Sequence, residues 1–162
     1  MKYGTRYNIE LAFELMRLYD KYHHCFQYAF QIERFLFTHA GISEEWFTNA
    51  FKAIRREEVA WQLNHCTNEQ KESLHYCGVN RGGSYSHGGI FWADKEEFIH
   101  PLEEYIQFVG HNRVQDIEEW KGVNGGKVFF CDSLHLGNYL IISLSGTMET
   151  CFQIVSLMDE WL

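Results

Sequence analysis

Apolar residues near the start of the chain recur with the period of an α-helix. After Asn8, a residue suited to capping a helix start, they repeat every three or four positions as far as Tyr22. The period then shortens, and two apolar segments separated by a turn predict two strands, Phe26–Ile32 and Arg34–Thr38. The second segment is apolar almost throughout, which is typical of a strand that is buried on both faces.

Three helical segments are predicted next. Ser43 is placed to cap the first, and the second covers Val59–Leu63. Thr67 and Gln70 have the spacing of a capping box, in which each side chain bonds the backbone of the other, and predict the start of the third. The expected apolar face of the first helix consists of Trp46, Phe47, Ala50, Phe51 and Ile54.

The second half of the chain is predicted to consist mainly of strands. A glycine-rich loop, Gly78–Phe91, comes first, and loops of this length are usually functional or disordered. A hairpin is expected directly after Gly125 and Gly126, and it pairs the predicted strands Lys127–Cys131 and Tyr139–Leu144. The resulting fold class is α/β (α+β), with a mixed sheet and with helices mainly in the N-terminal half. The predicted strands are Tyr105–Val109, Lys127–Cys131, Tyr139–Leu144 and Phe152–Leu157.

Length and composition narrow the class of protein. The 162 residues predict one domain, and Lys plus Arg total 14 against 22 Asp plus Glu, a net charge of −8. That charge repels nucleic acid, and no run approaches the ~18 apolar residues of a membrane helix. The first residues do not form a signal peptide. Five cysteines without a CxxC pair fit a reducing cytoplasm, so we expect a cytoplasmic protein.

Two histidines directly follow predicted strands. His39 comes after RFLFT and His111 after YIQFVG, each with a glycine nearby that allows the backbone to turn. The carboxyl ends of strands in layered α/β proteins converge on one edge, where ligands bind. The alternative is that each histidine has a purely structural role and only forms hydrogen bonds with nearby backbone at a strand end. Periodicity does not decide between these two interpretations.

Four segments resemble the calcineurin-like metallophosphoesterases. FLFTHAGIS, which contains His39, and FVGHNRV, which contains His111, are similar to two of that family's histidine segments. GGIFWAD, which ends at Asp94, resembles the Trp-x-Asp stretch of the serine/threonine protein phosphatase branch. KVFFCDSLHLGNYLII resembles the strand-turn-strand that follows the later histidine segment. The four segments occur in family order over residues 34–144.

The resemblance implies a two-metal hydrolase of phosphate esters built as a layered αββα sandwich. His39 and His111 would both bind one ion of a manganese, iron or zinc pair. Arg81 and Arg113 are candidates to grip phosphate, since a guanidinium binds phosphate with two hydrogen bonds, and Asp94 is a weaker candidate for the substrate site. The class of phosphate ester is left open.

Three motifs of the family are missing from the sequence. The D-x-H, G-D-x-x-D-R-G and G-N-H-[ED] segments carry the other ligands and the catalytic histidine in the family, and none occurs here. The chain therefore resembles the carboxyl-terminal half of such an enzyme, starting just after the third of these segments. We expect no catalytic residue in this chain and no hydrolysis by the chain alone.

Other interpretations stay open at this stage. The chain is alternatively a non-catalytic binding or assembly module that keeps the fold, or one chain of a two-chain enzyme. Because half a sandwich would expose an apolar sheet face, a homo-oligomer or a separate amino-terminal half is expected to cover it. Weaker candidates are zinc ligation by His23, His24 and Cys25 or by His65, Cys66 and Cys77, a Cys131 nucleophile, and phosphate cradled by Gly82-Gly83 or Gly88-Gly89.

Overall fold

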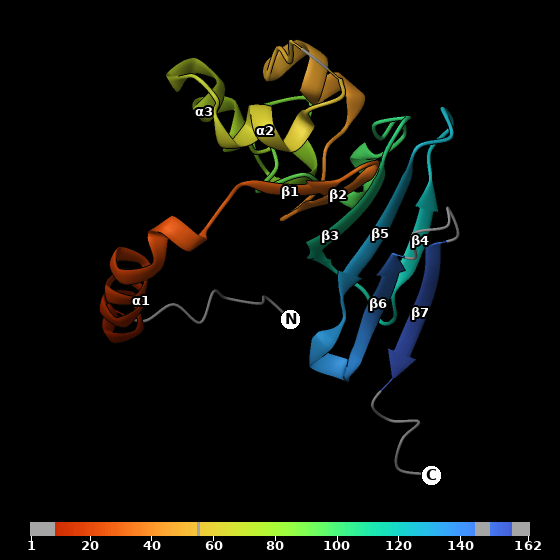
Figure 1. The fold of residues 1–162 in the computed structure, drawn as a ribbon. Helices are drawn as coiled ribbons and strands as arrows, with labels where there is room; N and C mark the ends of the chain where they lie inside the picture. Colours follow the sequence, from red (N-terminus) through yellow and green to blue (C-terminus); the bar gives the residue numbers. More distant parts are fainter. Residues whose placement is uncertain (1–8, 55, 145–149, 157–162) are drawn as a thin grey trace.

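The computed structural model describes residues 9–54, 56–144 and 150–156, and its centre is a five-stranded mixed sheet (Figure 1). The strand order is β1-β2-β3-β5-β4. The β2–β3 and β3–β5 pairs are parallel, whereas β1–β2 and β4–β5 are antiparallel. This arrangement confirms the mixed α/β (α+β) class. The strands are β1 Ala29–Ile32, β2 Phe35–Thr38, β3 Ile106–Arg113, β4 Glu118–Lys121 and β5 Lys127–Asp132.

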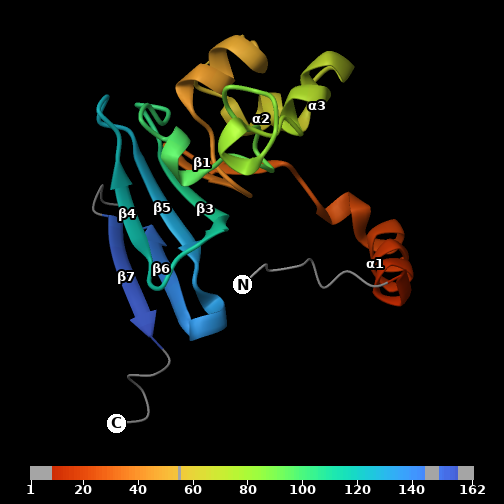
Figure 2. The same cartoon turned by 180° about the vertical axis from the view of Figure 1, so that it is seen from behind.

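Both faces of the sheet are covered near its centre, as the apolar sequence of β2 predicts. Leu36 on one face joins a core with the helical segments, while Phe35 on the other joins a cluster around Phe108. A separate two-stranded antiparallel sheet, β6 Asn138–Leu144 with β7 Thr150–Ser156, follows in the chain (Figure 2). Leu140 and Ile142 of β6 pack against the Phe108 cluster. The described chain is therefore layered as helices, sheet and sheet.

The described residues form three α-helices: α1 Ile9–Tyr22, α2 Val59–Asn64 and α3 Asn68–Leu74. The capping box at α3 is confirmed, with Thr67 Oγ1 accepting from the Gln70 amide at 3.3 Å and Gln70 Oε1 accepting from the Thr67 amide at 3.0 Å. Helix α1 stands apart from the sheet in both views (Figures 1 and 2), and Asn8, its expected cap, lies outside the described residues. No helix in the described ranges has the length and apolar content to span a bilayer.

The helix expected after Ser43 is shorter than predicted. Ser43 Oγ does accept from the Trp46 amide at 3.3 Å, but the backbone then widens into a π-helical turn, Trp46–Ala50. Its closing bond runs from the Phe51 amide to the Trp46 carbonyl at 2.9 Å. The wider turn places the rings of Trp46, Phe47 and Phe51 in the core, and the helix ends after this turn. Ile54, predicted to belong to the apolar face, is 85% exposed.

The predicted pairing of the last strands is wrong. Strand β5 forms a hairpin with β4 through the turn that contains Gly125 and Gly126, and β6 pairs with β7. The other edge of β5 is already occupied by β3, so β6 has no free edge of β5 to join. The sequence EEWK of β4 gave no apolar pattern, because β4 is an edge strand, and charged residues are common on such strands. Phe152–Leu157 is confirmed as a final strand as far as Ser156; Leu157 lies outside the described residues.

A buried glutamine ties β3 to the segment that follows β2. Gln107 is fully buried, and its Oε1 accepts from the Ile42 amide while its Nε2 donates to the Ile42 carbonyl, both at 2.8 Å. The neighbouring Gly41 has φ +103°, and a Cβ there would lie 2.5 Å from Cζ of Phe98. These contacts fix the path of the chain immediately after His39.

Replacing Gln107 with leucine is expected to lower the free energy of unfolding by about 2–4 kcal/mol, because the amide and carbonyl of Ile42 lose their buried partners. Urea unfolding followed by circular dichroism measures this change. Gln115→Leu is the matched control: Gln115 is exposed, so its substitution should change stability by less than about 0.5 kcal/mol. Equal effects of the two substitutions would contradict the role given to Gln107.

Candidate functional site

The two predicted histidines lie at the ends of adjacent parallel strands. Thr38, the last residue of β2, is in register with Val109 of β3. His39 follows directly, and its carbonyl accepts from the Gly110 amide at 2.9 Å. This backbone bond continues the β2–β3 pairing by one residue and brings His39 beside His111.

His111 occupies a bulge in β3. Val109 pairs with Phe130 of β5 and Arg113 pairs with Asp132, so three residues of β3 face one residue of β5 between these pairs. Strand β3 was predicted to end at Val109, but it resumes after the bulge. The backbone turn that was expected at the neighbouring glycine is found at His111 itself, with φ +62°. Bulges and left-handed non-glycine residues are enriched at functional sites because they turn one side chain out of the ladder.

The two imidazoles face each other across the strand ends. His39 Nε2 and His111 Nδ1 are 3.1 Å apart, and the ring centroids are 5.0 Å apart. His39 is exposed, whereas the Nε2 atom of His111 is buried and has no hydrogen-bond partner. Of the two ring nitrogens of His111, Nδ1 therefore faces His39 and Nε2 is left unpaired.

Two aromatic residues flank the pair. The Phe91 ring lies 6.2 Å from that of His39, and the Trp92 ring meets that of His111 edge-on at 5.8 Å. Trp92 is 44% exposed, so part of its indole faces solvent next to the histidines. The site therefore has an apolar wall that a substrate group could contact.

A polar network joins the other predicted residues to the bulge. Arg81 Nε donates to Asp94 Oδ2 at 2.7 Å, and Arg81 Nη2 donates to Asn112 Oδ1. Buried Asn112 also accepts from the Lys95 amide at 3.1 Å and donates to the Ala93 carbonyl at 3.1 Å. Asn112 thereby fixes the loop that carries Arg81 and Asp94 beside His111.

His111 is electrostatically coupled to this network. Burial lowers the pKa of His111 below its usual value of 6.5, and the positive charge of Arg81 and the neighbouring His39 lower it further. Asp94 and Asp132 act in the opposite direction with smaller effect. At pH 7 His111 is therefore neutral, the form that has a lone pair to offer a metal or a proton.

The structure thus gathers His39, His111, Arg81 and Asp94 in one place. Arg113, the fifth predicted residue, is exposed, and in the described part of the chain no hydrogen bond or ion pair joins it to the four. Sequence analysis gave no role to Asn112. Its position between two predicted site residues was a signal, but only the bulge shows that its side chain turns inward.

The weaker candidates have ordinary structural contacts. Burial raises the pKa of the Cys131 thiol to about 11, which disfavours the thiolate that a nucleophile requires. His65 Nδ1 lies 2.9 Å from the Trp61 carbonyl, and burial raises the pKa of Cys66. Across the described ranges, no three His, Cys, Asp or Glu residues are grouped closely enough to hold a metal ion.

No protein-family model, curated protein or solved structure matches this chain.

We expect Arg81→Gln to raise the pKa of His111, because the substitution removes a nearby positive charge. The pKa should remain below 6.5, since burial is the larger cause. A pH titration of the imidazole resonances by NMR measures it. Arg113→Gln removes the same charge outside the network and should leave the His111 titration nearly unchanged; an equal shift from both variants would contradict the coupling.

Proposed function

We propose that this chain contributes two imidazole ligands to the metal centre of a phosphoesterase, the remaining ligands coming from a second polypeptide segment. The observation that carries the proposal is the 3.1 Å separation of His39 Nε2 and His111 Nδ1 at the carboxyl edge of β2 and β3. The resemblance of both histidine segments to the calcineurin-like metallophosphoesterases supports it.

The spacing of the nitrogens fits one shared ion. Two imidazole nitrogens at about 2.0–2.1 Å from a metal lie about 2.8–3.4 Å apart for octahedral to tetrahedral angles. The two ring nitrogens already lie at that distance, because the bulge and the bond between His39 and Gly110 hold them there. Manganese, iron and zinc all accept imidazole, so the donor set suits any of the three.

The surroundings of His39 and His111 agree with a metal centre whose other ligands come from outside the described residues. A catalytic zinc ion takes three protein ligands, one more than the histidine pair supplies, and the buried Nε2 of His111 lacks an acceptor. In this proposal we interpret the layering of helices, β3-containing sheet and β6–β7 sheet as half of an αββα sandwich. A second segment bringing carboxylates to this edge would supply both the ligands and the missing acceptor.

Each residue of the network has a role in this proposal. Neutral His111 and exposed His39 offer lone pairs to the ion, which when bound would activate water and polarise a phosphoryl oxygen. Arg81, oriented by Asp94 and Asn112, places a positive charge beside His111, where an anionic phosphate would be attracted. Trp92 contributes a flat apolar surface next to that position.

Zinc titration followed by calorimetry tests the proposal. The chain should bind one ion, and His39→Ala or His111→Ala should each weaken binding by at least about tenfold, because each removes one of two ligands. His135→Ala, in an exposed histidine away from the pair, is the control and should leave affinity unchanged. The chain alone should not hydrolyse p-nitrophenyl phosphate with manganese.

Zinc affinity that is unchanged in both histidine variants would overturn the proposal and favour the non-catalytic module. Manganese-dependent hydrolysis that disappears in His39→Ala would instead show that the chain holds a complete centre, which would contradict the two-segment arrangement.

A further inference from the structure

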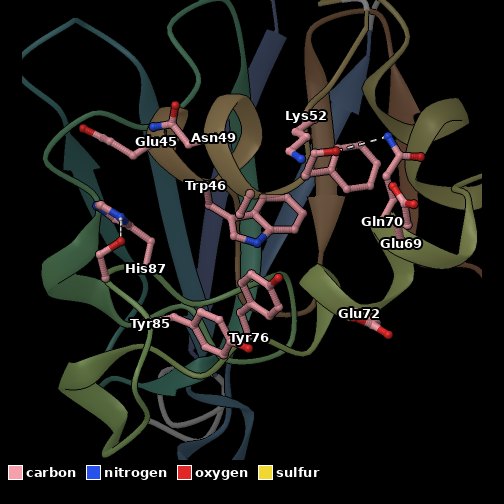
Figure 3. Close-up of a pocket in the computed structure, with 13 residues that line it drawn as sticks. Glu45, Trp46, Asn49, Lys52, Glu69, Gln70, Glu72, Tyr76, Tyr85 and His87 are labelled. Carbon is pink, nitrogen blue, oxygen red and sulfur yellow. Dashed lines mark hydrogen bonds between the residues drawn. The ribbon is translucent and has the colours of Figure 1, made fainter.

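A second site lies over the π-helical turn, away from the histidine pair. A cavity of about 570 Å³ opens above the indole of Trp46 (Figure 3). Trp46 is itself buried, and its Nε1 donates to the Ser73 carbonyl at 3.0 Å, so it forms a fixed apolar floor. The volume suits a small organic group or an amino acid side chain and far exceeds that of a bare ion.

The rim of the cavity is acidic. Glu45 stands on one side of Trp46, and Glu69 and Glu72 of α3 stand on the other (Figure 3). Lys52 is the one lysine or arginine among the lining residues, so three carboxylates stand against one ammonium at the rim. An entering group therefore meets a negative local potential on a chain whose net charge is −8.

Two stacked tyrosines form another part of the wall. The rings of Tyr76 and Tyr85 lie face to face with centroids 3.6 Å apart and an interplanar angle of 5°. Tyr85 is 43% exposed, so this pair is open to a ligand. The face of an aromatic ring carries partial negative charge and attracts cations. The aromatic faces and the carboxylates thus both favour a cationic ligand.

Glu45 is oriented from outside the cavity. Its Oε1 lies 2.6 Å from His100 Nδ1, and its Oε2 is buried without a hydrogen-bond partner. The side chain also borders a neighbouring hollow that His100 lines, so its part in the cavity over Trp46 is the negative charge that it adds to the rim.

Other ligand classes fit less well. The carboxylates of the rim are not close enough to one another to hold a metal ion, since the described residues contain no group of three metal-binding side chains. A phosphate or another anion would be repelled by the rim, and a purely apolar group would leave the glutamates unpaired.

We propose that this cavity binds an organic monocation, an alkylammonium or guanidinium group on an apolar stem. The stem lies over Trp46, and the charged head meets the tyrosines and glutamates. Such a group belongs either to a lysine or arginine side chain of a peptide or to a free amine, and the chemistry of the cavity is the same for both.

Calorimetric titration at low ionic strength, where surface charges are least screened, tests the proposal. The probes are the blocked amino acids Nα-acetyl-lysine and Nα-acetyl-arginine methylamide, the free monoamine n-pentylamine, and the neutral isostere Nα-acetyl-norleucine methylamide. The cationic probes should bind at least about tenfold more tightly than the neutral one. Tighter binding of the blocked amino acids identifies a peptide as the source, and tighter binding of the monoamine identifies a free amine.

A charge-matched pair of variants locates the binding. Glu69→Gln with Glu72→Gln should weaken the cationic probes by about fivefold or more, because it removes two rim carboxylates. Glu14→Gln with Glu96→Gln changes the net charge equally at exposed positions outside the cavity and should leave affinity nearly unchanged. Absence of saturable binding up to about 10 mM, equal binding of the neutral probe, or equal loss in both double variants would overturn the proposal.

Discussion

The two hydrogen bonds between the Gln107 side chain and the backbone of Ile42 join the parts on which the candidate site depends. They cross the face of the sheet and hold the segment after β2 against β3. With that segment fixed, the His39 carbonyl meets the Gly110 amide, and the bulge turns His111 toward His39. A polar side chain that is fully buried is costly unless both of its groups are bonded, so only one path of the chain satisfies Gln107.

One loop connects the histidine site with the cavity over Trp46. The segment from Tyr76 to Glu97 supplies Arg81 and Asp94 to the first, and Tyr85 and His87 to the second. Its fold is anchored by Glu97, which is buried and whose Oε2 accepts from the Gly88 amide at 2.5 Å. Burial raises the pKa of Glu97, and the bond to Gly88 opposes this rise. The same loop therefore borders both sites.

Much of the local structure could be predicted from the sequence. The capping box at Thr67 and the turn between β1 and β2 follow from patterns of neighbouring residues. The parallel placement of the two histidine segments does not, because they lie 72 residues apart and only the fold brings them together. The pairing of β5 could not be predicted in this way, because β4 is a short, charged edge strand without an apolar pattern. The bulge at His111 could not be predicted from the sequence either, because it depends on the register between β3 and β5.

The candidate site was likewise predictable from the sequence only in part. The sequence placed His39 and His111 at strand ends, and Arg81 and Asp94 were named from single motifs, yet nothing in the spacing showed that Arg81 and Asp94 form an ion pair. That contact spans the glycine-rich loop and depends on Asn112, a buried residue of β3. The cavity over Trp46 was not predicted, because it needs the π-helical turn, whose wider backbone has no clear sequence signal.

The central claim is that His39 Nε2 and His111 Nδ1 bind the same ion. Long-range ¹H–¹⁵N NMR spectra resolve each imidazole nitrogen, so a titration with Zn²⁺ tests the claim atom by atom. The account predicts that these two nitrogens shift together and saturate at one equivalent of zinc, while the nitrogens of the other histidines stay unchanged. Shifts confined to other histidines, or a shift of only one of the two nitrogens, would contradict it.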